Sequence, residues 1–320
     1  MAGARDWHTR PERGAIWGMR ITAWLYRWIG AASARILLYP IITYFFLTGA
    51  AARRASMDYL CRLYHSPGGA IALGAKPSWR MVFRHFLEFG HVTLDRLGFW
   101  LGRHQDFHFS INGMEHLDNV AEQGRGALII GAHVGSFDAM RLMADLRSPI
   151  SVNVLMYTRN APRINALLES LGRDDGRMKV RVIQVEPGSF THALEAKACI
   201  ERGEVVAVLG DRLHPNESDR GVPVTFLDGP ALLPQGPMLL AAVLRCPVLL
   251  MIGLRVGTGS YHVDVERFAD RIDIPRGERS RRVAGYCQVY ADRLAHYCRK
   301  APFQWFNFYP FWQVPGPTDG

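Results

Sequence analysis

The sequence predicts an α/β fold in which a mixed, largely parallel β-sheet is flanked by helices, with an apolar helical membrane-anchoring segment at the N-terminus. The first observation behind this prediction is an alternation that begins at Phe107, where short apolar runs are followed by stretches with helical spacing. Such alternation is typical of a sheet covered by helices. The second observation is a run of seventeen uncharged residues from Ile36 to Ala52, bracketed by arginines.

The apolar N-terminal run favours a helix embedded in a membrane surface over one that spans it. Its length is at the lower limit for a span, and Pro40 interrupts it. Upstream, Arg20, Arg27 and Arg35 recur every seven or eight residues, so a helix would place them on one face, near several tryptophans. A buried core helix remains the alternative. We therefore divide the chain into a membrane-associated helical segment, residues 1–55, and a larger domain, residues 56–320.

Length and composition limit the possible functions. A chain of 320 residues buries one sizeable core, and 48% apolar residues fit a globular protein. The net charge of +9 favours an anionic partner such as phospholipid headgroups, an acidic carrier protein or nucleic acid. The sequence contains no nucleic-acid recognition motif, so we expect no nucleic acid among the partners. The five cysteines are scattered and form no CxxC pair, which argues against a zinc ribbon or a disulfide framework.

The expected elements of the larger domain follow from these apolar runs. Residues 55–103 read as helical. The expected strands are Ala127–Ala132, Ile150–Tyr157, Val180–Val185, Val205–Leu209, Val222–Phe226, Pro247–Leu254 and Tyr261–Glu266. The expected helices are Phe137–Leu146, Ala161–Leu171, Phe190–Arg202, Gly236–Arg245 and Ser280–Lys300.

One segment has the composition of a catalytic site. A buried strand runs into His133, then Gly135 and Ser136, and Asp138 opens a helical stretch. On a continuous helix His133 and Asp138 would lie far out of register, but Gly135 allows a sharp turn and Ser136 is a suitable helix cap. The Asp138 carboxylate would then bind one imidazole nitrogen and leave the other free to act as a base. The structural alternative is a histidine without a chemical role.

Other kinds of site have less support. No second cluster of His and Asp has the spacing of metal ligands, and no GxSxG motif accompanies Ser136. We therefore expect neither a metal nor a cofactor.

Taken together, these residues resemble a known family. The His133 and Asp138 pair after an apolar strand is similar to the first block of the lysophospholipid acyltransferase superfamily, and within it the chain most resembles the branch of late acyltransferases of lipid A biosynthesis. Further similarities follow in the family's order over residues 10–312. They are Tyr157, Arg159 and Asn165; Gly210, Asp211 and Arg212 with Arg220–Val224 and Phe226–Gly229; Pro247; and Gln304, Trp305 and Phe306 in an aromatic tail.

The resemblance implies a transferase that moves a fatty acyl chain from an acyl carrier protein or coenzyme A thioester to a hydroxyl or amine of a lipid, glycolipid or other amphiphilic acceptor. His133 would act as the base and Asp138 would orient it. Substrate binding is expected at Arg159, Asn165, Asp211, Arg212, Arg220 and Gly229. The two guanidinium groups of Arg159 and Arg212 suit phosphate, although structural salt bridges are the alternative for both. Gly229 also fits an ordinary turn, and Trp305 fits either core packing or lipid contact.

Two departures from the branch concern the acceptor. Thr158, Arg159 and Asn160 replace the usual Arg-Pro after Tyr157, and Gly-Asp-Arg at 210–212 replaces an Asp-Gln type of pair. These changes put lipid A itself in doubt as the acceptor. We expect the protein at the cytoplasmic face of the inner membrane. A membrane-associated lipid-binding protein without catalytic activity, built on the same fold, is the alternative function.

Overall fold

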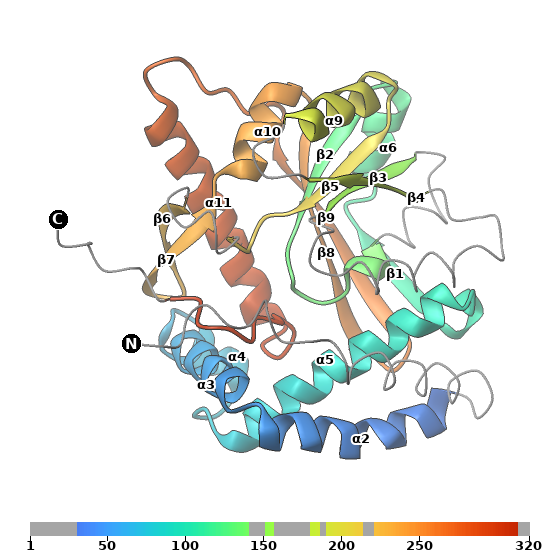
Figure 1. Ribbon diagram of the computed structural model, residues 1–320, viewed down its shortest axis with the longest axis vertical. Helices are drawn as coiled ribbons and strands as arrows, with labels where there is room; N and C mark the ends of the chain where they lie inside the picture. Colours follow the sequence, from blue (N-terminus) through green and yellow to red (C-terminus); the bar gives the residue numbers. More distant parts are fainter. Residues whose placement is uncertain (1–30, 141–150, 157–179, 186–189, 214–220, 313–320) are drawn as a thin grey trace.

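The computed structural model describes residues 31–140, 151–156, 180–185, 190–213 and 221–312, and these form an α/β structure with one large sheet (Figure 1). The strands are β1 His108–Asn112, β2 Ala127–Gly131, β3 Val152–Met156, β4 Val180–Gln184, β5 Val205–Leu209, β6 Gly221–Phe226, β7 Gly229–Pro234, β8 Val248–Gly257 and β9 Ser260–Ala269. The helices are α2 Ala31–Thr48, α3 Ala50–His65, α4 Gly69–Leu73, α5 Trp79–Trp100, α6 Glu115–Glu122, α9 Thr191–Glu201, α10 Gly236–Leu244 and α11 Arg279–Lys300, with a short 3₁₀ turn at His104–Asp106.

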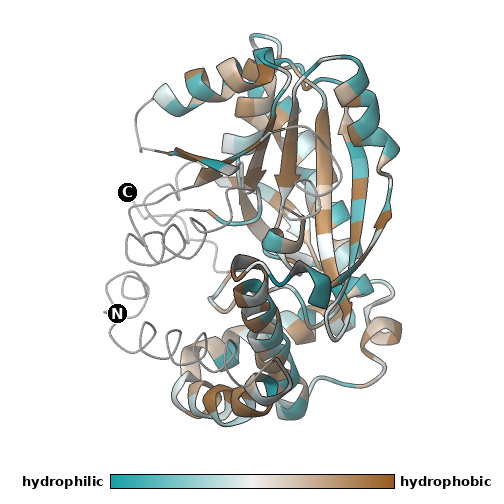
Figure 2. Cartoon of the chain, turned by 90° about the vertical axis from the view of Figure 1, so that its right-hand side faces the viewer, coloured by the Kyte–Doolittle hydropathy of each residue, from teal (hydrophilic) through white to brown (hydrophobic). Residues whose placement is uncertain are grey.

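The large sheet has seven strands in the order β1-β9-β8-β2-β5-β3-β4. Every pairing is parallel except that of β8 with β9, which a tight turn joins into an antiparallel hairpin. The central strand β2 is buried along its whole length, as expected for a strand with helices on both faces. In Figure 2 the strands of this sheet are mostly brown, whereas the helices around them carry both colours. The predicted mixed, largely parallel sheet is therefore confirmed.

Each of the seven expected strands is present, with ends that differ by up to a few residues. Two further strands, β1 and β7, are additional to the prediction. β7 pairs with β6 in a separate two-stranded hairpin. The expected helix Ala161–Leu171 lies outside the described residues, and of Phe137–Leu146 only the first residues, 137–140, are described, which are helical.

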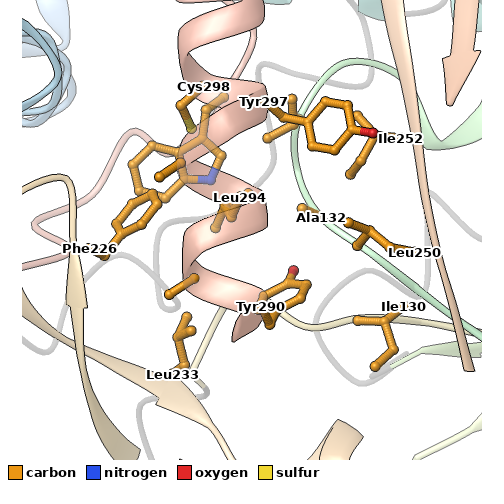
Figure 3. Close-up of a cluster of buried hydrophobic side chains, with 14 of the residues drawn as sticks. Ile130, Ala132, Phe226, Leu233, Leu250, Ile252, Tyr290, Leu294, Tyr297 and Cys298 are labelled. Carbon is orange, nitrogen blue, oxygen red and sulfur yellow. The ribbon is translucent and has the colours of Figure 1, made fainter. Parts of the chain in front are cut away.

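The main core lies between α11, the large sheet and the β6–β7 hairpin. Figure 3 shows α11 with Tyr290, Leu294, Tyr297 and Cys298 between these two partners. The partner side chains that the figure labels are Ile130, Leu250 and Ile252 from the sheet, Ala132 directly after β2, and Phe226 and Leu233 from the hairpin. The hydroxyl of Tyr290 donates a hydrogen bond to the carbonyl oxygen of Gly131 at 2.8 Å. The end of β2 is thus fixed by both packing and a hydrogen bond.

The helices α2 and α5 lie side by side along one end of the molecule (Figure 1). Asp95 of α5, which is fully buried, joins both helices to the sheet. It accepts hydrogen bonds from the Tyr261 hydroxyl at 2.9 Å, from Arg255 Nε at 3.3 Å and from Arg35 Nη2 at 3.4 Å. Because Arg35 belongs to α2 while Tyr261 and Arg255 belong to β9 and β8, one carboxylate connects three layers.

Helix α2 has one buried face and one exposed apolar face. Ala34, Leu38 and Ile42, spaced four residues apart, point into the molecule. The exposed large apolar side chains of the helix are Ile36, Tyr39, Tyr44, Phe45 and Leu47. Among the described residues no single helix is long and apolar enough to cross a bilayer, although Ser33–Thr48 and Ala50–His65 meet that criterion as a pair bent by 93°. The membrane-anchoring role and the division at residue 55, which falls inside α3, remain predictions.

Candidate active site

The loop after β2 turns sharply because of two residues. Gly135 has a φ of +66°, and a Cβ atom there would collide with the carbonyl oxygen of Gly253 on β8. The Ser136 Oγ then accepts a hydrogen bond from the Ala139 N–H at 3.1 Å and caps the helical residues that begin at 137. The turn and the cap predicted from the sequence are both confirmed.

The turn brings His133 next to Asp211, which follows the neighbouring strand β5. In the parallel pairing of β2 with β5, Gly131 is opposite Leu209. Two residues further along each strand are His133 and Asp211, so the register itself places these side chains together. The Nδ1–H group of His133 donates to Asp211 Oδ1 at 2.7 Å, and the His133 backbone N–H donates to Oδ2 at 3.0 Å.

The protonation states of the pair follow from burial and charge. Burial would raise the pKa of Asp211, but the bonds from His133 and the charge of Arg212 outweigh it and lower this pKa to about 2. Burial lowers the pKa of His133, and Arg212 and Arg96 add to the effect against the opposing pull of Asp211. Because a carboxylate only accepts hydrogen bonds, the neutral ring carries its proton on Nδ1. Nε2 is left as a free base on a side chain that is 28% exposed, while Asp211 is fully buried.

The predicted hydrogen bond between Asp138 and the imidazole ring is not the one in the structure. Asp138 lies in the first helical turn after Ser136, where its carboxylate pairs with Arg96 of α5. The ring instead binds Asp211, because adjacent parallel strands bring their ends together, whereas the helical turn directs Asp138 toward α5. Asp211, predicted to contact the substrate, is buried behind the histidine and supports it. A catalytic role for Asp138 remains a prediction.

Arg212 lies beside the histidine. Its Nη2 donates to the Phe306 carbonyl oxygen at 2.6 Å, and its guanidinium carbon lies 5.8 Å from the centre of the Tyr309 ring. Its Nε is buried and has no hydrogen-bond partner in the described parts of the chain. One edge of the guanidinium is therefore fixed by the protein, and Nε is a donor without an acceptor among the residues that the structure describes.

Of the other predicted binding residues, the structure describes Gly229 alone. Arg159, Asn165 and Arg220 lie outside the described residues. Gly229 begins β7 in the tight turn of the hairpin, next to Arg62 and Trp312. The turn interpretation of Gly229 accounts for its position.

The segment that the resemblance matched to an aromatic tail also forms part of the site. Residues 304–307, here called the tail segment, pair with the loop that carries His133. The Phe306 N–H donates to the His133 carbonyl oxygen at 2.9 Å, and the Gly135 N–H donates to the Gln304 carbonyl oxygen at 2.8 Å. Trp305 is fully buried and its indole N–H donates to Asp211 Oδ2 at 3.1 Å. Trp305 therefore packs in the core, which decides between the two alternatives left open for it.

The arrangement suits proton transfer by a histidine with a fixed tautomer. No cluster of three or more His, Cys, Asp or Glu side chains suited to a metal ion occurs among the described residues. The oriented base, its buried carboxylate and the adjacent guanidinium are the features of a site that deprotonates a nucleophile near an anionic group.

The comparisons with known proteins agree with this chemistry. The model of one protein family, described as bacterial lipid A biosynthesis acyltransferase, matches residues 75–314. The match includes β2, β5, the loop with His133 and the tail segment. No curated protein matches the chain significantly.

Proposed function

Since the chain belongs to the bacterial lipid A biosynthesis acyltransferase family, we propose that it transfers a fatty acyl chain from a thioester to a hydroxyl or amine of an amphiphilic acceptor. The observation that carries this proposal is the pairing of His133 with the buried carboxylate of Asp211, which leaves Nε2 free. A base of this kind is needed to activate a hydroxyl near neutral pH.

The reaction follows from the position of the proton. His133 Nε2 takes the proton of the acceptor as its oxygen or nitrogen attacks the thioester carbonyl carbon. The tetrahedral intermediate then collapses, the C–S bond breaks, and the imidazolium returns the proton to the leaving thiolate. Asp211 stabilises the imidazolium during this interval, as the carboxylate does in a Ser-His-Asp triad. Products are the acylated acceptor and a free thiol, so atoms and charge balance.

The guanidinium groups near His133 suit an anionic substrate. Arg212 is half-buried, its Nε has no partner within the described ranges, and the charge of Arg96 of α5 also lowers the pKa of the histidine. A phosphate on the acceptor or on the phosphopantetheine arm of the donor would accept from such a group. The donor is a carrier protein thioester or a coenzyme A thioester, since both contain this arm. The acceptor is proposed to be a lipid or glycolipid.

We place the reaction at the cytoplasmic face of the inner membrane. The support is the exposed apolar face of α2 and the excess of positive charge over the chain. Apolar side chains on one face of a helix next to arginines favour an interface with anionic lipid. An acyl chain attached to a lipid acceptor would then not have to leave the membrane surface.

The proposal is tested with the full-length protein on lipid vesicles, supplied with an acyl thioester and a bacterial lipid extract. Free thiol is followed with a chromogenic disulfide reagent, and the acylated lipid is identified by mass spectrometry. His133→Ala is expected to lower turnover by about two to four orders of magnitude. The matched control is His296→Ala, which removes an exposed histidine of α11. Equal turnover above the protein-free background in the wild type and His133→Ala would contradict His133 as the base. Turnover at background level in both would instead support a lipid-binding protein without catalysis.

A further inference from the structure

The tail segment is held on two sides, which fixes the position of Trp305. On one side it forms an antiparallel bridge with the His133 loop, between Val134 and Trp305. On the other side the Gln304 side chain binds the backbone of Arg255 twice, accepting from its N–H at 2.9 Å and donating to its carbonyl oxygen at 2.6 Å. The indole of Trp305 therefore has little freedom to move relative to the loop.

The carboxylate of Asp211 accepts three hydrogen bonds, from an imidazole, a backbone and an indole N–H group. Oδ1 accepts from His133 Nδ1, whereas Oδ2 accepts from the His133 backbone and from Trp305 Nε1. The backbone bond alone would allow the carboxylate to rotate about its own axis. The indole bond is the second point of attachment on Oδ2, and it aims Oδ1 at the imidazole ring.

We propose that Trp305 is a positioning residue for the histidine base, acting through its indole N–H on the Asp211 carboxylate. This inference rests on the proposed function, because it assigns Trp305 a part in the same acyl transfer. A purely structural role is the alternative, since the ring also packs against Tyr59, Phe226, Phe311 and Trp312. The two roles differ in whether the N–H group is needed.

Removing the indole N–H changes the proton affinity of the pair in a definite direction. A hydrogen bond to a carboxylate stabilises its charged form. Without that bond, the Asp211 carboxylate attracts the imidazolium proton more strongly, so the pKa of His133 rises. The limb of the pH–rate profile that reports protonation of the base then moves to higher pH.

The other ionisable groups near His133 and Asp211 do not mask the expected change in the pKa of His133. The cationic side chains that face His133 are Arg212 and Arg96, and both lower its pKa. Tyr290, Tyr309 and Cys298 face Asp211, and burial raises the pKa of each, so all three stay neutral. His85, whose Nε2 lies 2.9 Å from the Trp305 carbonyl oxygen, has its pKa lowered to about 4 by burial. Among the described groups that contact the pair, His133 is then the one whose protonation the acidic limb reports.

The test compares Trp305→Phe with Trp312→Phe. Trp312 is a matched control because it is buried in the same aromatic cluster, and its indole N–H also donates to one acceptor, the Phe226 carbonyl oxygen at 3.1 Å. Each variant loses one ring and one buried hydrogen bond, but only Trp305 touches Asp211. Trp305→Phe is expected to lower kcat about tenfold or more with little change in KM, and to move the acidic limb up by about half a pH unit. Trp312→Phe is expected to leave the limb in place.

A second measurement separates this inference from the proposed function. The pKa of His133 is read by NMR in protein with labelled histidine, with the signal assigned by its loss in His133→Ala, and no substrate is needed. If the wild type turns over no thioester, the proposed function fails while the titration still decides the role of Trp305. If Trp305→Phe does not fold, Trp305→benzothienylalanine keeps the shape of the ring and replaces N–H by sulfur. A His133 pKa that is the same in the position-305 variant as in Trp312→Phe would overturn the inference.

Discussion

The replacement Asp211→Asn tests the assignment of the histidine partner most directly. The carboxylate accepts from one N–H at Oδ1 and from two at Oδ2. Asparagine offers one oxygen and one NH₂ group in the same space. Its NH₂ group must therefore face either the Nδ1 of His133 or the pair of N–H groups from the His133 backbone and Trp305.

In the second orientation the NH₂ group faces two other hydrogen-bond donors, the His133 backbone N–H and the Trp305 indole N–H. This orientation is unfavourable, because neither of those groups can lose its proton and become an acceptor. The first orientation is tolerated, because the imidazole ring can change tautomer and accept at Nδ1. The proton then resides on Nε2, which is the nitrogen proposed to act as the base. The variant is therefore expected to keep its fold and to lose its catalytic activity.

The expected loss is large. The equivalent exchange in a Ser-His-Asp triad, which also produces the wrong tautomer, lowers turnover by about 10⁴. That factor corresponds to about 5.5 kcal/mol in the activation barrier. Asp138→Asn is expected to cost about tenfold to a hundredfold, because it weakens a partly exposed ion pair with Arg96 that lies near the base.

Thiol release on vesicles gives both rates, and urea unfolding of each variant checks that the fold is retained. The decisive result is which of the two variants, Asp211→Asn or Asp138→Asn, loses more activity. Full activity in Asp211→Asn, together with a loss of several orders of magnitude in Asp138→Asn, would refute the assignment from the strand register and restore Asp138 as the residue that orients the ring.

Three further predictions concern the anionic substrate, acid stability and membrane contact. Arg212→Ala is expected to raise the apparent KM more than it lowers kcat, and Arg212→Lys to recover only part of the loss, since an ammonium lacks the planar fork; steady-state kinetics check both. Burial lowers the pKa of His85 to about 4, below the pKa of a histidine in the unfolded chain. The neutral form of His85 therefore contributes to stability above about pH 6.5, and this contribution is lost as the pH falls toward 4, because the unfolded chain then binds a proton that the folded protein does not. Between pH 7 and pH 5 the wild type should lose about 2 kcal/mol more than His85→Gln, measured by urea unfolding. On α2, Phe45→Glu combined with Leu47→Glu should reduce co-sedimentation with anionic vesicles, whereas an unchanged bound fraction would count against this face as the contact.

Local patterns in the sequence predicted much of the fold. The apolar runs at β2, β5 and β8 formed strands because a sheet with covered faces needs continuous apolar segments. The strand Gly229–Pro234 was missed because it contains two prolines, which are compatible only with an edge position or a small hairpin such as this one. The strand His108–Asn112 was missed because the prediction rested on continuous apolar runs, whereas this edge strand alternates polar and half-buried apolar side chains.

The candidate site was predicted in part, for a related reason. His133, Gly135 and Ser136 lie within four residues, so their turn is visible in the sequence. The partner of His133 is 78 residues further along the chain. Their proximity depends on β5 lying beside β2, and strand order is not encoded in hydrophobic periodicity. Trp305, whose indole N–H donates a hydrogen bond to Asp211, lies even further along the chain from His133. Nothing in its sequence spacing distinguishes a ring that binds a carboxylate from one that only packs.

The pairing of the tail segment with the His133 loop also has a consequence for biosynthesis. A ribosome releases a chain from its N-terminus, so the loop and Asp211 emerge long before residues 304–307. During that interval helix α2, proposed above to contact the membrane, has already been made, while the loop lacks its partners at Gln304, Trp305 and Phe306. A nascent chain at the lipid surface is therefore expected to carry an incomplete site. The order in which the chain is made would delay catalysis until residues 304–307 have been synthesised, without any separate inhibitor.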